Sequence, residues 1–450
     1  MVKAKTVYFC TECGTESAKW TGQCTACKSW NTLKEEVIRK HQNVIDSNVL
    51  DFQSSIPKPI DEIQVGKTTR VSVTDKELTR VLGGGIVSGS VILVGGQPGI
   101  GKSTLLLQIA LSMDLDILYV SGEESEEQIK MRAERVPGNN PRCLIYTETD
   151  IEKILKQARK LSSKLLVIDS IQTLATGMID ASTGSISQIK ECTALLRKYA
   201  KASGTPIFII GHITKDGSIA GPKLLEHMVD VVLQFEGDQH HEYRILRGLK
   251  NRYGSTDEIG LYRMDQEGMK EVNNPSELLI SQSDESLSGS AIAASVEGQR
   301  PLLLETQALV TPSVYGNPQR TATGLDMRRL SMLLAVLEKR MRLPFGQHDV
   351  FLNIVGGLKI HDPGVDLAMV AALISSIEDA PIHRKYSFAG EVGLNGEVRS
   401  ISRIEQRVQE AARLGFEKIY IPTQSGYNNQ NTDIEVVQIA RVENLFDELF

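Results

Sequence analysis

The segment SVILVGGQPGIGKSTLLLQIALSM, residues 90–113, places a glycine-rich turn between two apolar runs. The turn matches the pattern G-x4-G-K-[ST], and a strand before it with a helix after it is the context in which this pattern binds phosphates. Glycines let backbone N–H groups close on phosphate oxygens, and the positive end of the following helix strengthens the attraction. The predicted nucleotide-binding residues of the turn are Gly96, Gln97, Pro98, Gly99, Ile100, Gly101, Lys102, Ser103 and Thr104.

Roles within this turn follow from side-chain chemistry. Lys102 is the expected catalytic cation at the β- and γ-phosphates of ATP, and Ser103 is the expected ligand of Mg²⁺. Thr104 offers a second hydroxyl near the α- and β-phosphates. Downstream, LLVID at 165–169 is an apolar run that ends in Asp169, which predicts a carboxylate beside the Mg²⁺ and the nucleotide.

The carboxylate that activates water must come from another strand, because Ser170 and not a glutamate follows Asp169. The apolar run 116–122 is followed by Glu123 and Glu124. We predict that Glu123 is the catalytic carboxylate and rank Glu124 below it. The alternative is an acidic pair that only stabilises a helix N-terminus.

Further polar features follow predicted strands. Ser125 and Gln128 have the spacing of a capping box, which would hold the loop before them. His212 is predicted to sense the γ-phosphate of the nucleotide, and a merely polar strand end is the alternative. The loops 176–187 and 214–224 are candidates for backbone contacts to a phosphate chain, or else ordinary solvent loops.

Apolar, β-branched runs alternate with helical patterns from about residue 58 to 270, which predicts an α/β fold with a parallel sheet. The expected strands are 90–96, 116–122, 142–147, 164–169, 206–211, 229–235, 242–250 and 258–264.

Cysteines are concentrated near the N-terminus, where four of the six lie within the first 27 residues. Cys10-x2-Cys13 and Cys24-x2-Cys27 form two hooks separated by ten residues, and two such hooks complete a tetrahedral site. We predict that these four cysteines bind Zn²⁺. Four unrelated thiols and a redox-active pair are the alternatives.

The surroundings of the hooks suggest how they are built. Gly14 and Gly22 are expected to supply the tight backbone that such hooks need. Trp20 and Trp30, with lysines beside them, are expected to pack against the hooks. Contact with DNA or with a protein partner is the alternative for these two rings.

Composition narrows the classes of protein. The chain has 450 residues, of which 41% are hydrophobic and 24% charged, as in an ordinary folded protein. A net charge of −6 excludes a globally basic nucleic-acid binder but allows a local basic groove. No apolar run is long enough to span a bilayer, and the N-terminus has no apolar signal core. We therefore expect a cytoplasmic protein with no membrane partner, in a compartment that keeps thiols reduced.

Changes in composition predict the domain boundaries. The expected order is a C4 zinc ribbon at 1–33, a linker at 34–57, the ATPase domain at 58–275, a linker at 276–290 and a second folded domain at 291–450. The two linkers are polar, and the first ends in IPKP, which resists regular structure.

The sequence LKNRYG at 249–254 carries two cations, Lys250 and Arg252, at the end of a predicted exposed strand. No acid adjoins them in the sequence, which indicates an anionic target. That target is the γ-phosphate held by a neighbouring subunit, as for an arginine finger, or it is DNA. Solvated surface cations are the remaining alternative.

The motifs in this order resemble those of the bacterial RadA (Sms) family of DNA-repair proteins. The resemblance spans essentially the whole chain, and its central part is similar to the RecA/DnaB ATPase core. That family carries KNRFG, so Tyr253 stands in the phenylalanine position. Beside the double CxxC and the glycine-rich turn, the motifs are SGEES at 121–125, VIDS at 167–170, GHITKDG at 211–217 and KNRYG at 250–254.

The last domain resembles the proteolytic domain of Lon proteases in HDPGVDLAMVAAL (361–373) and GEVGLNGEVRSISRIEQRVQEAARLGF (390–416). No counterpart of the nucleophilic serine occurs in 362–367, and Glu405 stands where the catalytic lysine of Lon lies. Because a Ser–Lys dyad needs both groups, the resemblance implies an inactive protease fold reused for assembly and DNA contact. The candidate DNA-facing cations are Arg320, Arg328, Arg329, Arg340 and Arg342. For each of them, an ordinary surface charge is the alternative.

Together the resemblances imply an α/β protein with a RecA-like P-loop ATPase core, an N-terminal C4 zinc ribbon and a C-terminal α+β, Lon-protease-like domain. They imply a cytoplasmic, DNA-dependent ATPase of homologous recombination that uses ATP, Mg²⁺ and Zn²⁺. Such a protein would form a homo-oligomeric ring, a hexamer in the family, and would act with the RecA recombinase. It would process branched DNA by branch migration or translocate on single-stranded DNA as a DnaB-type helicase. A signalling switch built on the same core and, less favoured, an ATP-dependent protease are the alternatives.

Overall fold

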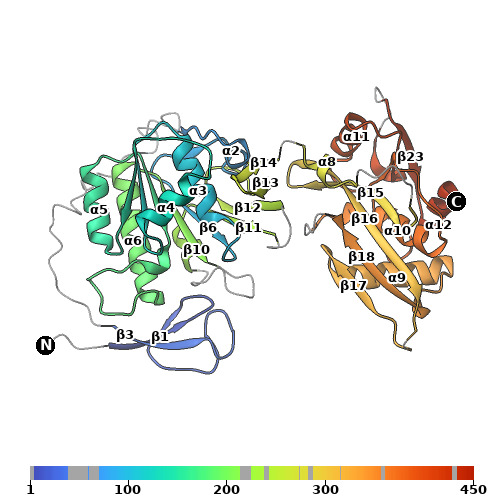
Figure 1. Cartoon of the computed structure of the whole chain (residues 1–450). Coiled ribbons are helices and arrows are strands. Elements are labelled where there is room, and N and C mark those ends of the chain that lie inside the picture. The colour runs from blue at the N-terminus through green and yellow to red at the C-terminus, as the bar shows by residue number, and fades with distance from the viewer. Residues whose placement is uncertain are drawn as a thin grey trace. The chain divides into compact units, whose positions relative to one another are not determined.

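The chain folds into two compact units, the first ending at Glu271 and the second beginning at Val272. The computed structural model is coloured along the chain in Figure 1. It describes residues 5–38, 59, 70–212, 224–237, 243–272, 274–281, 287–314, 316–355, 360–427 and 433–450.

A small antiparallel sheet carries the cysteine hooks, in the strand order β2-β1-β3. Its strands are β1 (Lys5–Cys10), β2 (Glu16–Ser17) and β3 (Leu33–Ile38). Strand β3 pairs with β1 along its whole length, from Leu33 opposite Cys10 to Ile38 opposite Lys5. The predicted boundary at residue 33 is therefore too early, because β1 needs β3 as its hydrogen-bonding partner. The rest of the predicted linker falls mostly outside the described residues.

The central sheet contains every strand expected from the apolar runs. Among the described residues its order is β14-β13-β12-β11-β6-β10-β9-β7-β8. The strands are β6 (Val91–Gly96), β7 (Ile117–Ser121), β8 (Cys143–Thr147), β9 (Leu165–Asp169), β10 (Ile207–His212), β11 (Val231–Glu236), β12 (Tyr243–Asn251), β13 (Ile259–Asp265) and β14 (Gly268–Glu271).

Strands β6 to β11 are parallel, as expected, but β12, β13 and β14 run antiparallel to their neighbours. The expected parallel pattern therefore does not extend to the last strands at this edge. The reason is the length of the connections, because a short turn such as the one between Asp265 and Gly268 can only join antiparallel strands. The P-loop strand β6 and the strand β9 that ends in Asp169 are separated by β10, and the α/β fold class is confirmed.

Helices cover both faces of this sheet (Figure 1). Buried side chains of α2, α3 and α4 form one core with the sheet, and those of α5, α6 and α7 form the other. The bounds are α2 (Lys76–Val81), α3 (Lys102–Ser112), α4 (Glu126–Ala133), α5 (Ile151–Lys160), α6 (Ile186–Ser203) and α7 (Leu224–Met228). Strand β4 (Arg70–Val71) pairs antiparallel with β5 (Ile86–Val87), and α2 lies between them in the chain. A 3-10 turn, η2, spans Ile171–Thr173.

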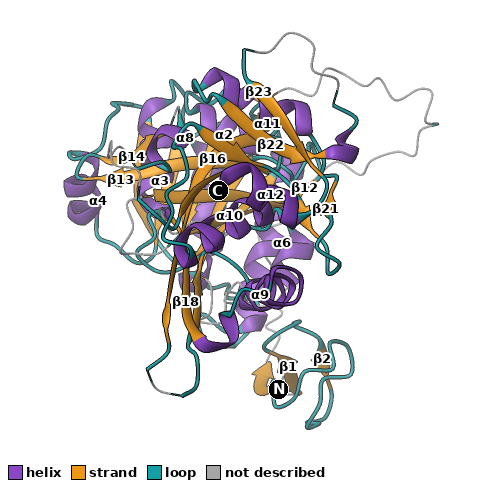
Figure 2. Cartoon of the chain, turned by 90° about the vertical axis from the view of Figure 1, so that its right-hand side faces the viewer, coloured by secondary structure: helices purple, strands orange, loops and turns teal. Residues whose placement is uncertain are grey.

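The second unit is α+β, as expected. Its larger sheet has the order β17-β18-β16-β15-β19-β22-β23, and α10 packs against β15 and β16 (Figure 2). The strands are β15 (Ser290–Glu297), β16 (Arg300–Pro312), β17 (Arg320–Thr323), β18 (His348–Ile354), β19 (Tyr386–Phe388), β20 (Glu391–Val392), β21 (Val398–Arg399), β22 (Lys418–Pro422) and β23 (Glu435–Ile439). The helices are α8 (Pro275–Leu278), α9 (Met327–Met341), α10 (Asp366–Ile377), α11 (Ile404–Arg413) and α12 (Val442–Leu449).

The predicted linker at 276–290 is wrong at its start. Ser276 is buried, and its hydroxyl accepts from the backbone N–H of Leu303 at 3.0 Å. The backbone N–H of Glu305 donates to the carbonyl of Leu279 at 2.9 Å. Residues 276–279 are thus packed into the second unit, and the boundary between the units lies near residue 272.

Candidate functional site

The glycine-rich turn leaves β6 at the carboxyl edge of the central sheet and enters α3. Its tip, 97–99, is exposed, whereas Ile100 is fully buried and anchors the turn. Gly101 caps α3 with a φ of 108°, a left-handed conformation that favours glycine. A Cβ at Gly101 would lie 2.5 Å from the terminal methyl of Met264, a flexible side chain that could move aside, so it is the conformation that favours glycine there.

Lys102 is held inside the turn. Its side chain is 4% exposed, and Nζ donates to the carbonyls of Gly96 at 2.8 Å and Gln97 at 3.0 Å. Burial lowers the pKa of Lys102 to about 8, although the carboxylates of Asp169 and Glu123 favour its charged form. The amine of Lys102 is therefore held inside the glycine-rich turn by backbone carbonyls.

Asp169 ends β9 and is only 5% exposed. The hydroxyl of Tyr119, in the middle of β7, donates to its Oδ2 at 2.7 Å. Tyr119 is buried, and burial together with the charge of Asp169 raises the pKa of its hydroxyl well above the ordinary value, so it stays a donor. Sequence reasoning missed Tyr119, whose only signal was a polar atom in an otherwise apolar strand.

Glu123 is exposed at the tip of β7, beside the end of β9. The hydroxyl of Ser170 donates to Glu123 Oε1 at 2.5 Å, and the N–H of Gly122 donates to the carbonyl of Asp169 at 2.9 Å. A Cβ at Gly122 would collide with the side chain of Thr173, so glycine permits this close approach. The structure thus brings Lys102, Asp169 and Glu123 to one edge of the sheet, as the sequence predicted.

Glu124 has a different environment from Glu123. It forms an ion pair with Arg132 of α4, and its backbone N–H donates to Ser121 Oγ at 3.0 Å. The predicted capping box is confirmed, with Ser125 and Gln128 bonded reciprocally. Glu124 therefore ties the loop before α4 to the last turn of that helix, whereas Glu123 faces Ser170.

The other predicted phosphate contacts are only partly described. The backbone of His212 pairs in register with Gly96 at the end of β10, but the side chain of His212 lies outside the description. Nearly all of the loop 214–224 also lies outside the described residues. The loop 176–187 is organised by Gln188, whose buried amide donates to carbonyls of that loop, which makes it an ordered segment.

Lys250 and Arg252 lie at the opposite, amino edge of the sheet. Val231 pairs with both Ile92 and Asn251, which places this motif near the start of β6, whereas the P-loop follows its end. Lys250 Nζ donates to the carbonyls of Glu226 at 2.6 Å and Val229 at 2.8 Å. Lys250 thus holds the end of α7 in place, and burial lowers its pKa.

Arg252 is 57% exposed and donates to Asp230 Oδ1 at 3.4 Å. Asp230 is only 3% exposed and also accepts from Lys201 Nζ at 2.9 Å and from the N–H of Val91 at 3.1 Å. Folding therefore brings Asp230, an acid distant in the sequence, beneath the motif. Lys201 also donates to the hydroxyl of Tyr253 at 3.1 Å, a bond that a phenylalanine could not accept.

The four cysteine sulfurs of the ribbon converge within 4.8 Å of one another. Sγ of Cys10 lies 3.6 Å from that of Cys27, and Sγ of Cys13 lies 3.5 Å from that of Cys24. A tetrahedron with Zn–S bonds of about 2.3 Å has sulfur–sulfur edges of about 3.8 Å, so the four thiols fit zinc. Burial raises the pKa of Cys10 to about 11, so zinc binding must displace a proton there.

The two hooks use different residues at the same backbone position. Gly14 follows the first hook with a φ of 68°, as expected, and Lys28 follows the second with a φ of 64°. The expectation for Gly22 is wrong, because the left-handed turn of the second hook falls on Lys28. Hydrogen bonding with Ser29 lowers the pKa of Cys27 to about 6, which favours the thiolate that a metal binds.

A buried ion pair joins the segment 362–367, where the serine of Lon would lie, to Arg407 of α11, two residues beyond Glu405. Arg407, 1% exposed, bonds Asp362 through Nη1 at 2.6 Å and Nη2 at 3.1 Å. A Cβ at Gly364 would lie 2.6 Å from Arg407 Nη1, so the guanidinium occupies the space of a side chain there. Glu405 is exposed at the start of α11. This arrangement offers no nucleophile and no neutral amine.

Arg329 is not a free cation, contrary to the sequence expectation. Its Nε donates to Asp366 Oδ1 at 2.8 Å, and its Nη2 donates to the carbonyl of Val392 at 3.2 Å. Asp366 is completely buried, so Arg329 neutralises it and fixes α9 against the start of α10. The other candidates differ in exposure: Arg320 is half-buried, whereas Arg328, Arg340 and Arg342 are exposed.

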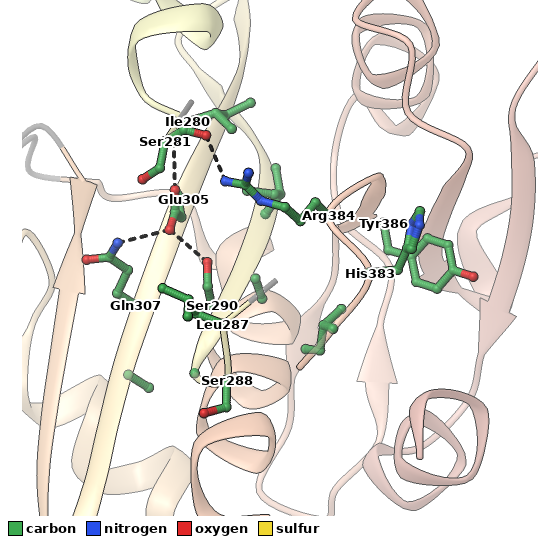
Figure 3. Close-up of a pocket in the computed structure, with 15 residues that line it drawn as sticks. Ile280, Ser281, Leu287, Ser288, Ser290, Glu305, Gln307, His383, Arg384 and Tyr386 are labelled. Atoms are coloured by element: carbon green, nitrogen blue, oxygen red, sulfur yellow. Dashed lines mark hydrogen bonds between the residues drawn. The ribbon is translucent and has the colours of Figure 1, made fainter. Parts of the chain in front are cut away.

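A cavity of about 540 Å³ lies in the second unit (Figure 3). Its buried carboxylate, Glu305, accepts from the N–H of Ser281 at 2.8 Å, from Ser290 Oγ at 2.7 Å and from Gln307 Nε2 at 2.9 Å. Arg384 donates to the carbonyl of Ser281 at 2.8 Å. These polar groups bond one another, so they stabilise the wall of the cavity and give no sign of a ligand.

Three family models match parts of the chain. One described as a rubredoxin metal binding domain matches residues 8–35, and one described as an AAA domain matches 64–218. One described as subunit ChlI of Mg-chelatase matches 313–425. The first match agrees with the four thiols, and the ribbon is a zinc ribbon.

Curated relatives match along the whole chain. The DNA repair protein RadA of Bacillus subtilis (strain 168) is 49% identical over 451 residues, 98% of each chain. The DNA repair protein RadA of Pseudomonas aeruginosa is 44% identical over 452 residues, all of both chains. Among solved structures, a KaiC-like protein of Pyrococcus horikoshii OT3 is 17% identical with a TM-score of 0.38, over 46% of this chain and 99% of that one. The RadB recombinase is 22% identical with a TM-score of 0.36, over 45% of this chain and 99% of that one.

In the described part of the chain, no helix combines the length and the apolar character that crossing a membrane requires.

Proposed function

Because the chain belongs to the RadA family of DNA repair proteins, we propose that it is a DNA-dependent ATPase that processes branched recombination intermediates. The observation that carries the proposal is the convergence of Lys102, Asp169 and Glu123 at the carboxyl edge of the central sheet. Branch migration and DnaB-type translocation on single-stranded DNA are the two forms that the activity can take.

The P-loop residues are suited to ATP and Mg²⁺. Lys102 would bind the β- and γ-phosphates, and the N–H groups at the start of α3 would bind phosphate oxygens. Ser103 and Asp169 would hold Mg²⁺, which neutralises phosphate charge. Tyr119 positions Asp169 by its hydrogen bond. Glu123, exposed beside Ser170, would accept the proton of the attacking water.

Lys250 and Arg252 are proposed to act on a nucleotide held by a neighbouring subunit. Their position at the amino edge of the sheet, away from the P-loop of the same chain, supports action across a subunit boundary. Lys250 has a supporting role in this arrangement, because it is engaged by the carbonyls at the end of α7. Such a contact requires an oligomer, which we propose to be a homo-hexameric ring. We also propose that His212 senses the γ-phosphate.

The second unit is proposed to have an inactive Lon-like fold that serves assembly and DNA contact. The buried Arg407–Asp362 pair in place of a dyad supports this role and disfavours an ATP-dependent protease. The exposed Arg328, Arg340 and Arg342 remain candidates for DNA contact. The RecA recombinase is the proposed protein partner and the cytoplasm the proposed location, where thiols stay reduced and able to bind zinc.

ATP hydrolysis measured with and without single-stranded DNA tests the proposal. We expect DNA to accelerate hydrolysis in the parent and Lys102→Ala to abolish it, because no other cation of the turn can neutralise the phosphates. Lys130→Ala, which removes an exposed lysine of α4, is the matched control and should hydrolyse at the parental rate. An ATP hydrolysis rate that is the same with and without DNA would favour the signalling switch. ATP hydrolysis by Lys102→Ala at the parental rate would refute the assignment of the glycine-rich turn as the nucleotide site.

A further inference from the structure

The zinc ribbon exposes two large aromatic rings. Trp20 is 57% exposed and Trp30 is 69% exposed. The expectation that these rings mainly pack against the cysteine hooks is therefore wrong. They are also the only two tryptophans among the 450 residues, which makes them a selective spectroscopic probe.

The backbone of the ribbon brings the two rings together at Gly22. A Cβ at Gly22 would lie 3.6 Å from Cζ3 of Trp30 and 3.9 Å from Cη2 of Trp20. The N–H of Asn31 donates to the carbonyl of Gly22 at 2.8 Å, and Gln23 forms a β-bridge with Trp30. The position of the pair is thus set by the fold of the ribbon itself, around the second cysteine hook.

Lysines accompany both rings in the sequence. Residues 17–34 contain three lysines, Lys19, Lys28 and Lys34, and no aspartate or glutamate. Lys19 precedes Trp20, and Lys28 lies two positions before Trp30; both lysines are exposed. Each exposed ring therefore has an exposed lysine close to it in the sequence. Over the whole described ribbon, residues 5–38, four glutamates balance the four lysines.

We propose that Trp20 and Trp30, with Lys19 and Lys28, form a platform that binds single-stranded DNA by base stacking. Every base has a π-face that an indole can stack on, and lysines beside the rings contact the phosphates that join the bases. Tryptophan is enriched at the centres of protein interfaces but lysine is depleted there, so the two lysines are the feature that favours DNA over a protein partner. The inference rests on the proposed function for its ligand class, but it concerns a site separate from the P-loop.

The test uses the full-length, zinc-loaded protein and an oligothymidylate labelled at one end. Anisotropy of the label measures binding to any part of the protein, and tryptophan fluorescence reports on the ribbon alone. We expect the oligonucleotide to quench tryptophan fluorescence at the same concentrations at which anisotropy rises. Lys19→Ala and Lys28→Ala should each reduce the slope of log affinity against log salt by about 0.7, one phosphate contact on a single strand.

Substitution of the rings gives the size of the effect. Trp30→Ala should weaken binding about 5- to 150-fold, the loss of one stacked base, whereas Trp30→Phe should restore much of the affinity. Zinc content of each variant, measured in the same samples, verifies that the ribbon is folded.

Each outcome is decisive. Binding by anisotropy with unchanged tryptophan fluorescence, and with parental affinity in Trp30→Ala, would overturn the platform and leave the proposed function intact. Absence of any DNA binding would overturn both. A fluorescence change caused by the RecA recombinase but not by the oligonucleotide would reassign the surface to a protein partner.

Discussion

Arg252 is too far from the P-loop of its own chain to act on a nucleotide bound there. The N–H of Asp230 donates to the carbonyl of Val91, and the N–H of Arg252 donates to the carbonyl of Asp230, so Arg252 lies level with the start of β6. The P-loop begins at Gly96, five residues along that strand. At about 3.3 Å per residue the separation along β6 is about 16 Å, more than the three methylenes of an arginine can bridge.

Arg252→Ala should therefore reveal a contact made across a subunit boundary. An arginine finger supplied by a neighbouring subunit increases the rate of hydrolysis by about 10³–10⁵, which corresponds to about 4–7 kcal/mol of transition-state stabilisation. We expect hydrolysis to fall by that factor while ATP binding is retained. The fold should survive, because Asp230 keeps its bonds to Lys201 and Val91.

A mixture of Arg252→Ala with Lys102→Ala is the decisive assay. Each variant is inactive alone, but a mixed ring contains interfaces that pair an intact P-loop with an intact Arg252. In an equal mixture such interfaces are about a quarter of the total, so roughly a quarter of the parental hydrolysis should return. Arg142→Ala is the matched control, since Arg142 precedes β8 and pairs with the exposed Asp114; it should keep full activity.

The reasoning is refuted if the two variants co-assemble, as shown by light scattering, and no activity returns. Arg252 would then contact DNA or act within its own chain. Full hydrolysis by Arg252→Ala alone would also exclude the residue from catalysis.

Three further perturbations test other parts of the chain. Glu123→Gln should reduce hydrolysis by about 10²–10⁴ without loss of ATP binding, whereas Glu124→Gln should retain turnover; equal rates in the two variants would contradict the assignment. Chelation should remove about one zinc per chain and unfold the ribbon, because zinc binding contributes about 10–16 kcal/mol to the folding free energy of such a module. The ATPase core should stay folded. Metal analysis that finds no zinc in the purified protein would contradict this prediction. Asp362→Ala should lower the free energy of unfolding in urea by about 3–5 kcal/mol, because buried Arg407 loses its counter-charge, whereas the exposed Glu435→Ala should change it little. Burial favours the neutral form of Asp362, but the bonds from Arg407 outweigh this effect and hold its pKa below the ordinary value. The contribution of this pair to the free energy of unfolding should thus be complete above about pH 3.9, and it should disappear as the pH falls through the lower folded pKa of Asp362. If the free energy of unfolding depends on pH in the same way in Asp362→Ala as in the parent, the result would count against the pair.

Local patterns predicted the elements of this protein well. The P-loop, the cysteine hooks and the Ser125–Gln128 capping box each depend on residues within a few positions of one another, whose backbone geometry follows from short-range sterics and hydrogen bonding. The strands of the core were found because burial on both faces leaves continuous apolar runs. The strand ends at Asp169 and before Glu123 also predicted that these two carboxylates lie at one edge of the sheet, since parallel strands bring their carboxyl ends together.

Partners distant in sequence could not be found in this way. Tyr119 and Asp169 are 50 residues apart, Asp230 and Val91 are 139 apart, and Arg407 and Asp362 are 45 apart. Which of these groups meet depends on the order of the strands and on which faces pack together, and these are decided by the burial of whole sheets and helices. A charge that looks unpaired along the chain, as Arg252 does, therefore acquires its acid only when β11 and β12 pair and bring Asp230 beneath it.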